Sequence, residues 1–199
     1  QAVEPTRKRG EWDGGVTVLG PDKGGHLSLL IGQRLEKGAA LDGVFRNVAK
    51  SLPEGLNNFI RLDAATGGKT GIHQMDVSQL INVDLQKVLD KDTHIWLAIG
   101  DDRGLIYVGP DGKERLKSAL ETPETSTKLA EMSLSVGRLA PYFDLEKSEA
   151  MRAVAETIFG KEYKNDTVTM SLEGGESLQW KLRVPGKVLS FAGALRGTE

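Results

Sequence analysis

Hydrophobic and polar positions along the chain form a unit that is used three times between residues 15 and 122. Each unit has two short strands around a glycine-rich turn, followed by an amphipathic helix. In the first unit we expect strands over 15–19 and 26–34 and a helix over 39–52, which Pro53 ends. The helix is predicted because five apolar residues recur at helical spacing on one face: Leu41, Val44, Phe45, Val48 and Leu52.

The second unit repeats this order with a shorter helix. Strands are predicted over 58–64 and 72–77, around the turn Gly67-Gly68-Lys69-Thr70. A helix is expected near 83–89, with Leu85, Val88 and Leu89 as its apolar face.

The third unit differs because its strands are apolar on both faces. Apolar side chains occupy successive positions over 95–99 and 105–108, so both faces of this hairpin must be shielded from water. We therefore place the hairpin at the centre of the sheet. A helix over 111–120, with Leu116, Ala119 and Leu120 inward, can cover one face. For the other face we predict either an apolar cavity or an exposed apolar patch, beside four residues: Trp96, Leu97, Leu105 and Tyr107.

The pattern changes after the polar stretch 122–127. A strand over 128–136 leads into a helical region that Gly160 caps. Alternation of apolar and polar residues then indicates an antiparallel sheet with one buried face. Three closing strands are expected, over 168–172, 178–184 and 188–195.

These elements predict an α+β fold with a largely antiparallel sheet, helices mainly on one face and a C-terminal three-strand meander. Residues 1–14 contain little that could enter a core except Trp12, and we interpret them as a flexible tail. A single domain is expected over 15–199, with 123–127 as the best place for a subdomain seam.

Composition and charge exclude some classes of binding partner and only a few kinds of catalytic chemistry. The 199 residues include 26 basic and 28 acidic side chains, so no global field attracts nucleic acid. There is no cysteine, which excludes disulfides and thiolate catalysis. No apolar run approaches the roughly 18–20 residues of a membrane helix, so no membrane span is expected. We expect no cofactor and no metal, and the oligomeric state stays open.

Groups that could carry catalysis have simpler structural interpretations. The turn at 67–70 resembles the end of a phosphate-binding loop, but it leads into a strand, so we interpret it as a hairpin turn. His26, His73 and His94 lack metal-ligand spacing, although the first two become neighbours if the units are equivalent. Two acidic pairs fall in predicted turns, where aspartate caps its own backbone: Asp101-Asp102 and Asp90-Lys91-Asp92.

Large aromatic side chains are candidates for an interaction surface. Trp96 and Trp180 alternate with other apolar strand residues and are expected in the core. Trp12 and the pair Tyr142-Phe143 have no such place, so they are candidates for a surface that binds a partner.

The run from His94 to Leu120, with its turn at 101–104, resembles uncharacterised exported bacterial proteins. This resemblance implies an extracytoplasmic location, in the periplasm or cell envelope, and assigns no functional residue. The strands that are apolar on both faces carry a looser resemblance to periplasmic lipoprotein-carrier folds. In those folds a curved antiparallel sheet wraps around helices and encloses an apolar cavity.

Together these patterns favour a non-enzymatic extracytoplasmic module that binds a partner protein or an apolar, lipid-like ligand. One alternative is a hydrolase, which requires a cleft where His26, His73 or an acidic pair converge. Another alternative is a structural domain of a longer protein.

Overall fold

The computed structural model of the protein describes residues 13–22, 24–53, 55–81, 85–123, 130–174 and 177–196. The chain divides into two compact units, residues 1–123 and 124–199, hereafter unit 1 and unit 2. The division falls at the seam expected near 123–127. Trp12 and most of the predicted tail lie outside the described residues, and Gly14 already belongs to the first strand.

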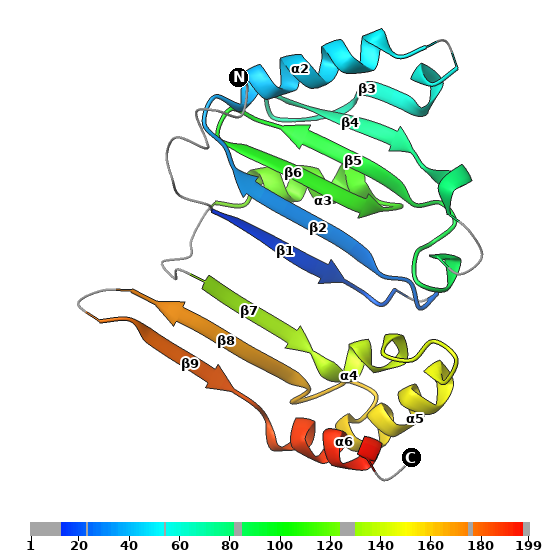
Figure 1. Cartoon of the computed structure of the whole chain (residues 1–199), viewed down its shortest axis with the longest axis vertical. Coiled ribbons are helices and arrows are strands. Elements are labelled where there is room, and N and C mark those ends of the chain that lie inside the picture. The colour runs from blue at the N-terminus through cyan, green and yellow to red at the C-terminus, as the bar shows by residue number, and fades with distance from the viewer. Residues whose placement is uncertain are drawn as a thin grey trace. The chain divides into compact units, whose positions relative to one another are not determined.

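Unit 1 is built on a six-stranded antiparallel sheet (Figure 1). The strand order is β1-β2-β6-β5-β4-β3. The hairpin predicted for the third strand–strand–helix repeat, β5 and β6, is therefore central, as expected. Every neighbouring pair is antiparallel, which confirms the α+β class with a largely antiparallel sheet. The strands are β1 (Gly14–Leu19), β2 (Ser28–Arg34), β3 (Ile60–Gly67), β4 (Thr70–Asp76), β5 (His94–Ile99) and β6 (Arg103–Gly109).

Helix α3 (Gly112–Glu121) covers one face of this sheet and completes the main core. Its Leu116 is fully buried, while Ala119 and Leu120 pack against the same cluster, as predicted. Gly112 is required here because a Cβ would lie 2.1 Å from a ring carbon of Trp96. The buried residues of this core are Ile72, Trp96, Ala98, Leu105, Tyr107 and Leu116.

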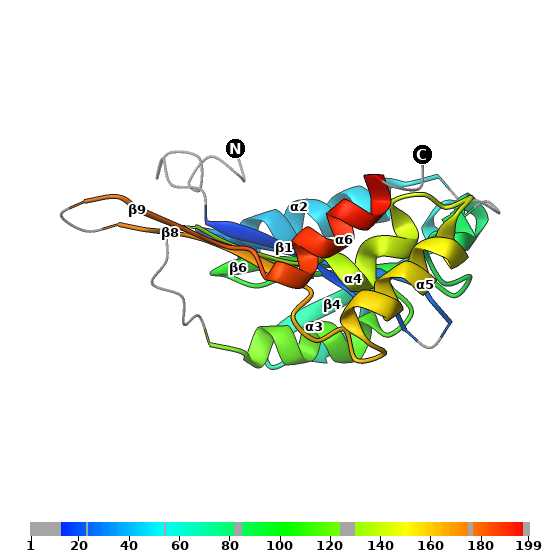
Figure 2. The same cartoon turned by 90° about the horizontal axis from the view of Figure 1, so that it is seen from below.

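Helix α2 (Gly38–Ser51) contacts the opposite face of the sheet, as Figure 2 shows. Consecutive strand residues point to opposite faces. On β4, Ile72 lies in the core under α3, whereas His73 meets α2. The expectation that the helices lie mainly on one face is therefore not confirmed for this sheet.

The apolar face predicted for α2 is turned only partly toward the sheet. Val44 and Val48 are 47% and 56% exposed, so their predicted burial is wrong. The side of α2 that faces the sheet carries Asp42 and Arg46 beside Phe45, whose ring centroid lies 5.2 Å from that of His73. A buried polar partner on β4 sets this rotation, because an unpaired buried imidazole would be costly.

Short 3-10 segments connect the strands of unit 1. They are η1 (Asn57–Phe59), η2 (Ser78–Leu80) and η3 (Leu85–Lys87). The predicted strand over 58–64 thus begins at Ile60. Of the helix predicted near 83–89, the described part is the single turn η3, and residues 82–84 lie outside the described residues.

Unit 2 contains a three-stranded antiparallel meander of β7 (Ala130–Ser135), β8 (Thr167–Glu173) and β9 (Gln179–Arg183). The predicted C-terminal meander is therefore present, but segment 188–195, expected as a strand, is a helix. The helical segments are α4 (Val136–Leu139), η4 (Ala140–Tyr142), α5 (Ser148–Phe159) and α6 (Gly186–Arg196).

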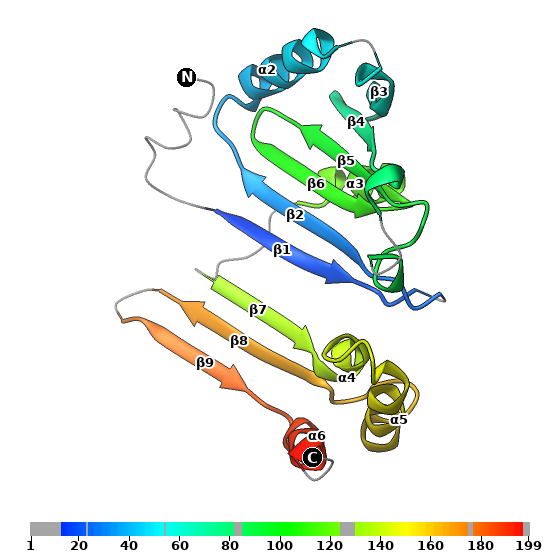
Figure 3. The same ribbon diagram turned by 45° about the vertical axis from the view of Figure 1, so that its right-hand side comes forward.

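The helices of unit 2 gather at one end of its sheet (Figure 3). Their core is Ala140, Ala155, Phe159 and Phe191, and the two phenylalanine rings lie 5.5 Å apart. Gly160 caps α5 with φ +79, as predicted. Within the described part of the chain, no helix is long and apolar enough to cross a membrane.

Candidate functional site

Three of the residues predicted beside an apolar cavity lie in the core of unit 1. Trp96, Leu105 and Tyr107 are each at most 8% exposed and pack under α3. The indole of Trp96 donates a hydrogen bond to the carbonyl of Gly109 at 3.3 Å. The fourth residue, Leu97, points to the other face and is half-buried.

The other aromatic candidates lie in unit 2 or outside the described residues. Tyr142 ends η4 and is half-buried, while Phe143, the next residue, is 54% exposed. Trp12 lies outside the described residues.

The face of the unit-1 sheet opposite α3 is apolar over four strands. In β5 and β6, fully buried residues under α3 alternate with more exposed residues on this second face. The strand register aligns two rows, which we name the unit-1 apolar face. The first row is Val16, Ile31, Ile106 and Leu97, and the second is Val18, Leu29, Val108 and Ile95.

The unit-1 apolar face is exposed on β1 and at Ile106 of β6, whereas its residues on β2 are half-buried. Val16, Val18 and Ile106 are 62%, 51% and 37% exposed. Helix α3 lies behind the sheet (Figure 1), and α2 lies on the side of the unit-1 apolar face, where it contacts β3, β4 and β5. Three of the eight side chains of this face are thus exposed, on β1 and β6, and the other five are half-buried.

An apolar groove continues the second row of this face. Ile95 is paired with Met75 on β4, and Met75 with Ile60 on β3. Both Met75 and Ile60 line a groove of about 410 Å³. Its apolar lining comes from the end of α2, η1, β3 and β4: Leu52, Leu56, Phe59, Ile60, Met75 and Val77.

Unit 2 carries a second apolar sheet face. Its register places three rows side by side: Ala130, Leu172 and Trp180; Met132, Met170 and Leu182; Leu134 and Val168. Trp180 is 61% exposed, so its predicted place in the core is wrong. The helices of unit 2 pack around Phe159 and Phe191 and leave Trp180 uncovered within this unit.

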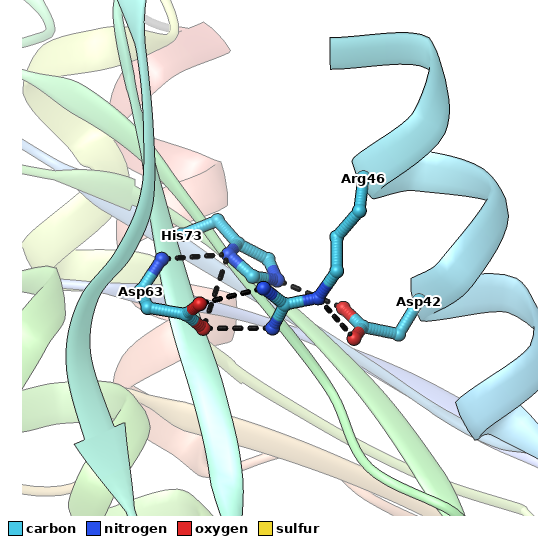
Figure 4. Close-up of polar contacts among 4 residues, drawn as sticks. All are labelled: Asp42, Arg46, Asp63 and His73. Carbon is cyan, nitrogen blue, oxygen red and sulfur yellow. Dashed lines mark hydrogen bonds and ion pairs between the residues drawn. The ribbon is translucent and has the colours of Figure 1, made fainter. Parts of the chain in front are cut away.

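The densest polar cluster joins α2 to β3 and β4 (Figure 4). His73 is fully buried, and its Nε2 lies 2.8 Å from Oδ1 of Asp42. The backbone N–H of Asp63 donates to Nδ1 of His73 at 3.1 Å. The ring proton therefore sits on Nε2 and is donated to Asp42.

Arg46 completes this cluster with three short hydrogen bonds. Its Nε donates to Oδ2 of Asp42 at 2.6 Å. Its two terminal nitrogens donate to the two carboxylate oxygens of Asp63, at 2.6 and 2.7 Å. Asp63 adopts φ +53 where the pairing of β3 with β4 is irregular, and this turn aims its carboxylate at Arg46.

Charge pairing stabilises the ionised form of both carboxylates. Hydrogen bonds from Arg46 hold the pKa of Asp63 below its ordinary value. Burial raises the pKa of Asp42, but hydrogen bonds from Arg46 and His73 outweigh that effect, so its pKa is also lowered. Every charged group of this cluster thus bonds to another member, which is typical of a structural clamp.

The other histidines lie apart from His73. Strands β5 and β6 separate β4 from β2, and His26 lies ahead of β2, so the prediction that His26 and His73 are neighbours is wrong. The first and second strand–strand–helix repeats have the same order of elements along the chain, but their strands are not neighbours in the sheet. His94 borders a small polar pocket of about 70 Å³, together with Arg61 and Asp76.

The remaining candidates are turns, as predicted. Gly68 and Lys69 form the β3–β4 hairpin turn, with Gly68 at φ +59. Oδ1 of Asp90 accepts the backbone N–H of Asp92 at 2.7 Å. Asp101 and Asp102 lie between β5 and β6 and are exposed.

Comparisons with protein-family models, with curated proteins and with solved structures find no match to this chain. The site and its geometry therefore carry the functional argument.

Proposed function

We propose that the protein is a non-enzymatic binding module whose unit-1 apolar face docks on an apolar surface of a partner protein. One observation carries this proposal. Eight aligned apolar side chains cover four neighbouring strands, and Val16 and Val18 are more than half exposed. An apolar sheet face is normally buried against a second layer. Large contiguous apolar patches mark interaction sites.

The shape of this face favours a protein over a small apolar ligand. Small ligands bind in concave sites that bury about 70–90% of their surface. On an open sheet face a small ligand would stay largely exposed to water. A helix or sheet of a partner protein, in contrast, is large enough to cover the sheet face. The second row crosses all six strands from Val18 to Ile60, which is about 24 Å at 4.8 Å per strand. A helix of about 16 residues has that length.

The groove gives the partner an anchoring point. It lies at one end of the second row and is lined by Leu52, Phe59 and Met75. Interface energy concentrates where a large side chain fills a pocket. We therefore place one large apolar side chain of the partner in the groove.

The polar cluster around His73 supports a binding role over hydrolysis. A hydrolase needs a base that is free to reach substrate. His73 is fully buried, and both of its ring nitrogens are bonded to Asp42 or Asp63. The groove is lined chiefly by apolar residues, with Asp76 as its one charged lining residue among those described.

An extracytoplasmic location is part of the proposal and rests on the resemblance of the run 94–120. Fractionation of the host cells tests it directly. The protein is expected in the periplasmic or envelope fraction, and its recovery with cytoplasmic markers would contradict the location while leaving the binding role intact.

Site-specific photo-crosslinking in the host tests the docking surface. A photo-reactive amino acid replaces Ile106 on the unit-1 apolar face, or Val48 on the outer side of α2 as the control. These two aliphatic side chains are 37% and 56% exposed, so accessibility alone favours the control. We expect one protein product from position 106 and none from position 48.

Two results would contradict this proposal. One is the absence of a protein product from position 106. The other is a lipid, found by native mass spectrometry of the purified protein and displaced by blocking the groove, which would make the protein a carrier of an apolar ligand.

A further inference from the structure

A second polar cluster joins two connections at one end of the unit-1 sheet. Asp22 and His26 lie between β1 and β2, and Asp90 lies between η3 and β5. The backbone N–H of Leu27 donates to the carbonyl of Val88 at 2.7 Å, which ties the two connections together. The side-chain donor atoms of the three residues all lie within 4.8 Å of one another.

The distances in this cluster differ from those of hydrogen bonds. Nδ1 of His26 lies 3.4 Å from Oδ1 of Asp22 and 3.4 Å from Oδ2 of Asp90. Hydrogen bonds from nitrogen to oxygen are about 2.7–3.2 Å long. This Nδ1 atom is buried and has no hydrogen-bond partner among the described residues. A bound water or ion is one explanation for a buried polar atom in that state.

The same distances fit two ligand atoms on one tetrahedral ion. Nitrogen and oxygen ligands lie about 2.1 Å from zinc, and two such atoms in tetrahedral geometry are about 3.4 Å apart. Octahedral coordination at about 2.1 Å brings neighbouring ligands to about 3.0 Å. The two separations from Nδ1 of His26 therefore fit tetrahedral better than octahedral coordination.

Backbone contacts hold each carboxylate in place. Oδ1 of Asp22 accepts the backbone N–H groups of Gly24 and His26, both at 2.8 Å. Oδ1 of Asp90 accepts from the backbone of Asp92, which leaves Oδ2 on the side of His26. Such outer contacts orient metal ligands.

Gly24 lies beside two of the three donors, those of His26 and Asp22. A Cβ at this position would lie 2.7 Å from Nδ1 of His26 and 3.2 Å from Oδ1 of Asp22. Any larger residue would therefore crowd the two donor atoms. The space is adjacent to both donors and is not filled by a side chain of position 24.

We propose that Asp22, His26 and Asp90 bind a Zn²⁺ ion, with a water molecule in the fourth position. The imidazole favours a transition ion over calcium or magnesium. Three protein ligands with one open position are the pattern of zinc sites that bind exogenous groups. The sequence did not predict this site because Asp90 is distant from His26 along the chain and comes from a different connection.

Zinc titration of the metal-free full-length chain by isothermal calorimetry tests this site. Competition from other strong donors is low, because the chain has no cysteine and the described residues hold no other group of three donors that could bind a metal ion. We expect one Zn²⁺ per chain. Asp22→Asn, His26→Gln and Asp90→Asn should each weaken binding at least tenfold, and His94→Gln should leave it within twofold. Asparagine at 22 and 90 can still accept the backbone hydrogen bonds.

Two further measurements separate ligation from loss of fold. Gly24→Ala retains all three ligands and should weaken zinc binding at least tenfold, whereas Gly43→Ala, whose Cβ meets nothing within 4 Å, should not. X-ray absorption of the zinc-loaded protein should show one imidazole and oxygen neighbours near 2.0–2.1 Å. Zinc affinity that is unchanged in the three ligand variants, or no binding by the wild type at millimolar Zn²⁺, would overturn the site.

Discussion

At the scale of single residues, His73 shows what the sequence pattern can and cannot reveal. Its place on a strand was predictable, but its burial against α2 was not. Asp42 and Arg46 are four residues apart and have the pattern of an ordinary surface pair on a helix. Their partners are His73 and Asp63, which lie in other elements. Only the packing of α2 on the sheet brings the four groups together.

Arg46→Gln should lower the free energy of unfolding by about 1–2 kcal/mol, because it leaves the carboxylates of Asp42 and Asp63 without their strongest donor. The matched control is Arg115→Gln, which disrupts an exposed pair with Asp111 at the same i,i+4 spacing. That change should cost about 0.5 kcal/mol or less. Urea unfolding at pH 7 measures both, and equal losses would contradict the clamp role.

The same cluster should make stability sensitive to acid. The pKa of Asp63 is lowered in the folded state by hydrogen bonds from Arg46, so its contribution is present above the unfolded pKa of about 3.9. That contribution is lost as the pH falls from there through the folded pKa. Asp63→Asn should therefore lose less stability than the wild type between pH 4.5 and pH 2.5. Parallel loss in both proteins, measured by urea unfolding, would refute this assignment.

Gly71 leaves the space that the Arg46–Asp63 pair occupies. A Cβ there would lie 2.1 Å from Oδ1 of Asp63 and 2.8 Å from a guanidinium nitrogen of Arg46. Gly71→Ala should therefore separate the pair and lower the melting temperature by several degrees. Gly43→Ala, in the middle of α2, should keep or raise it, because alanine favours a helix. A Gly71→Ala protein as stable as the wild type would contradict the close packing.

At the scale of elements, both alternation and uninterrupted apolar runs identified strands, but one such run, 188–195, was assigned to the wrong type of element. The strand pairs of unit 1 were predictable because glycine-rich turns mark the ends of two of the hairpins. The run 188–195 reads equally well as a buried strand or a helix. Val188, Phe191 and Leu195 have the spacing of one helical face, and these residues do pack together in α6. Periodicity could have identified this helix, but the expectation of a third closing strand obscured it.

Phe191→Ala should strongly destabilise unit 2. Its ring is 2% exposed and packs on Phe159, so truncation should cost about 3–5 kcal/mol. Leu189→Ala in the same helix removes a side chain that is 64% exposed and should change stability by less than about 0.5 kcal/mol. Thermal unfolding followed by circular dichroism distinguishes the two, and similar effects would contradict the burial of α6 on its Phe191 side.

At the scale of the whole molecule, the α+β class and the central hairpin followed from the sequence. The number of compact units and the surroundings of Trp180 did not, because both depend on which faces acquire a second layer. The apolar positions of β5 and β6 indicated two dry faces, but α3 covers only one of them. We propose that a partner protein covers the second face. The groove beside Met75 is the proposed anchoring point for that partner.

The central claim is that the unit-1 apolar face binds a protein partner, and affinity for the crosslinked partner tests it most directly. The variant Val16→Thr, Ile31→Thr, Ile106→Thr keeps β-branched side chains, so its fold should be retained. Its control is Val44→Thr, Val48→Thr on the outer side of α2. We expect the face variant to bind at least tenfold more weakly, a loss of about 1.4 kcal/mol. Equal affinity of the two folded variants for the partner would contradict the claim.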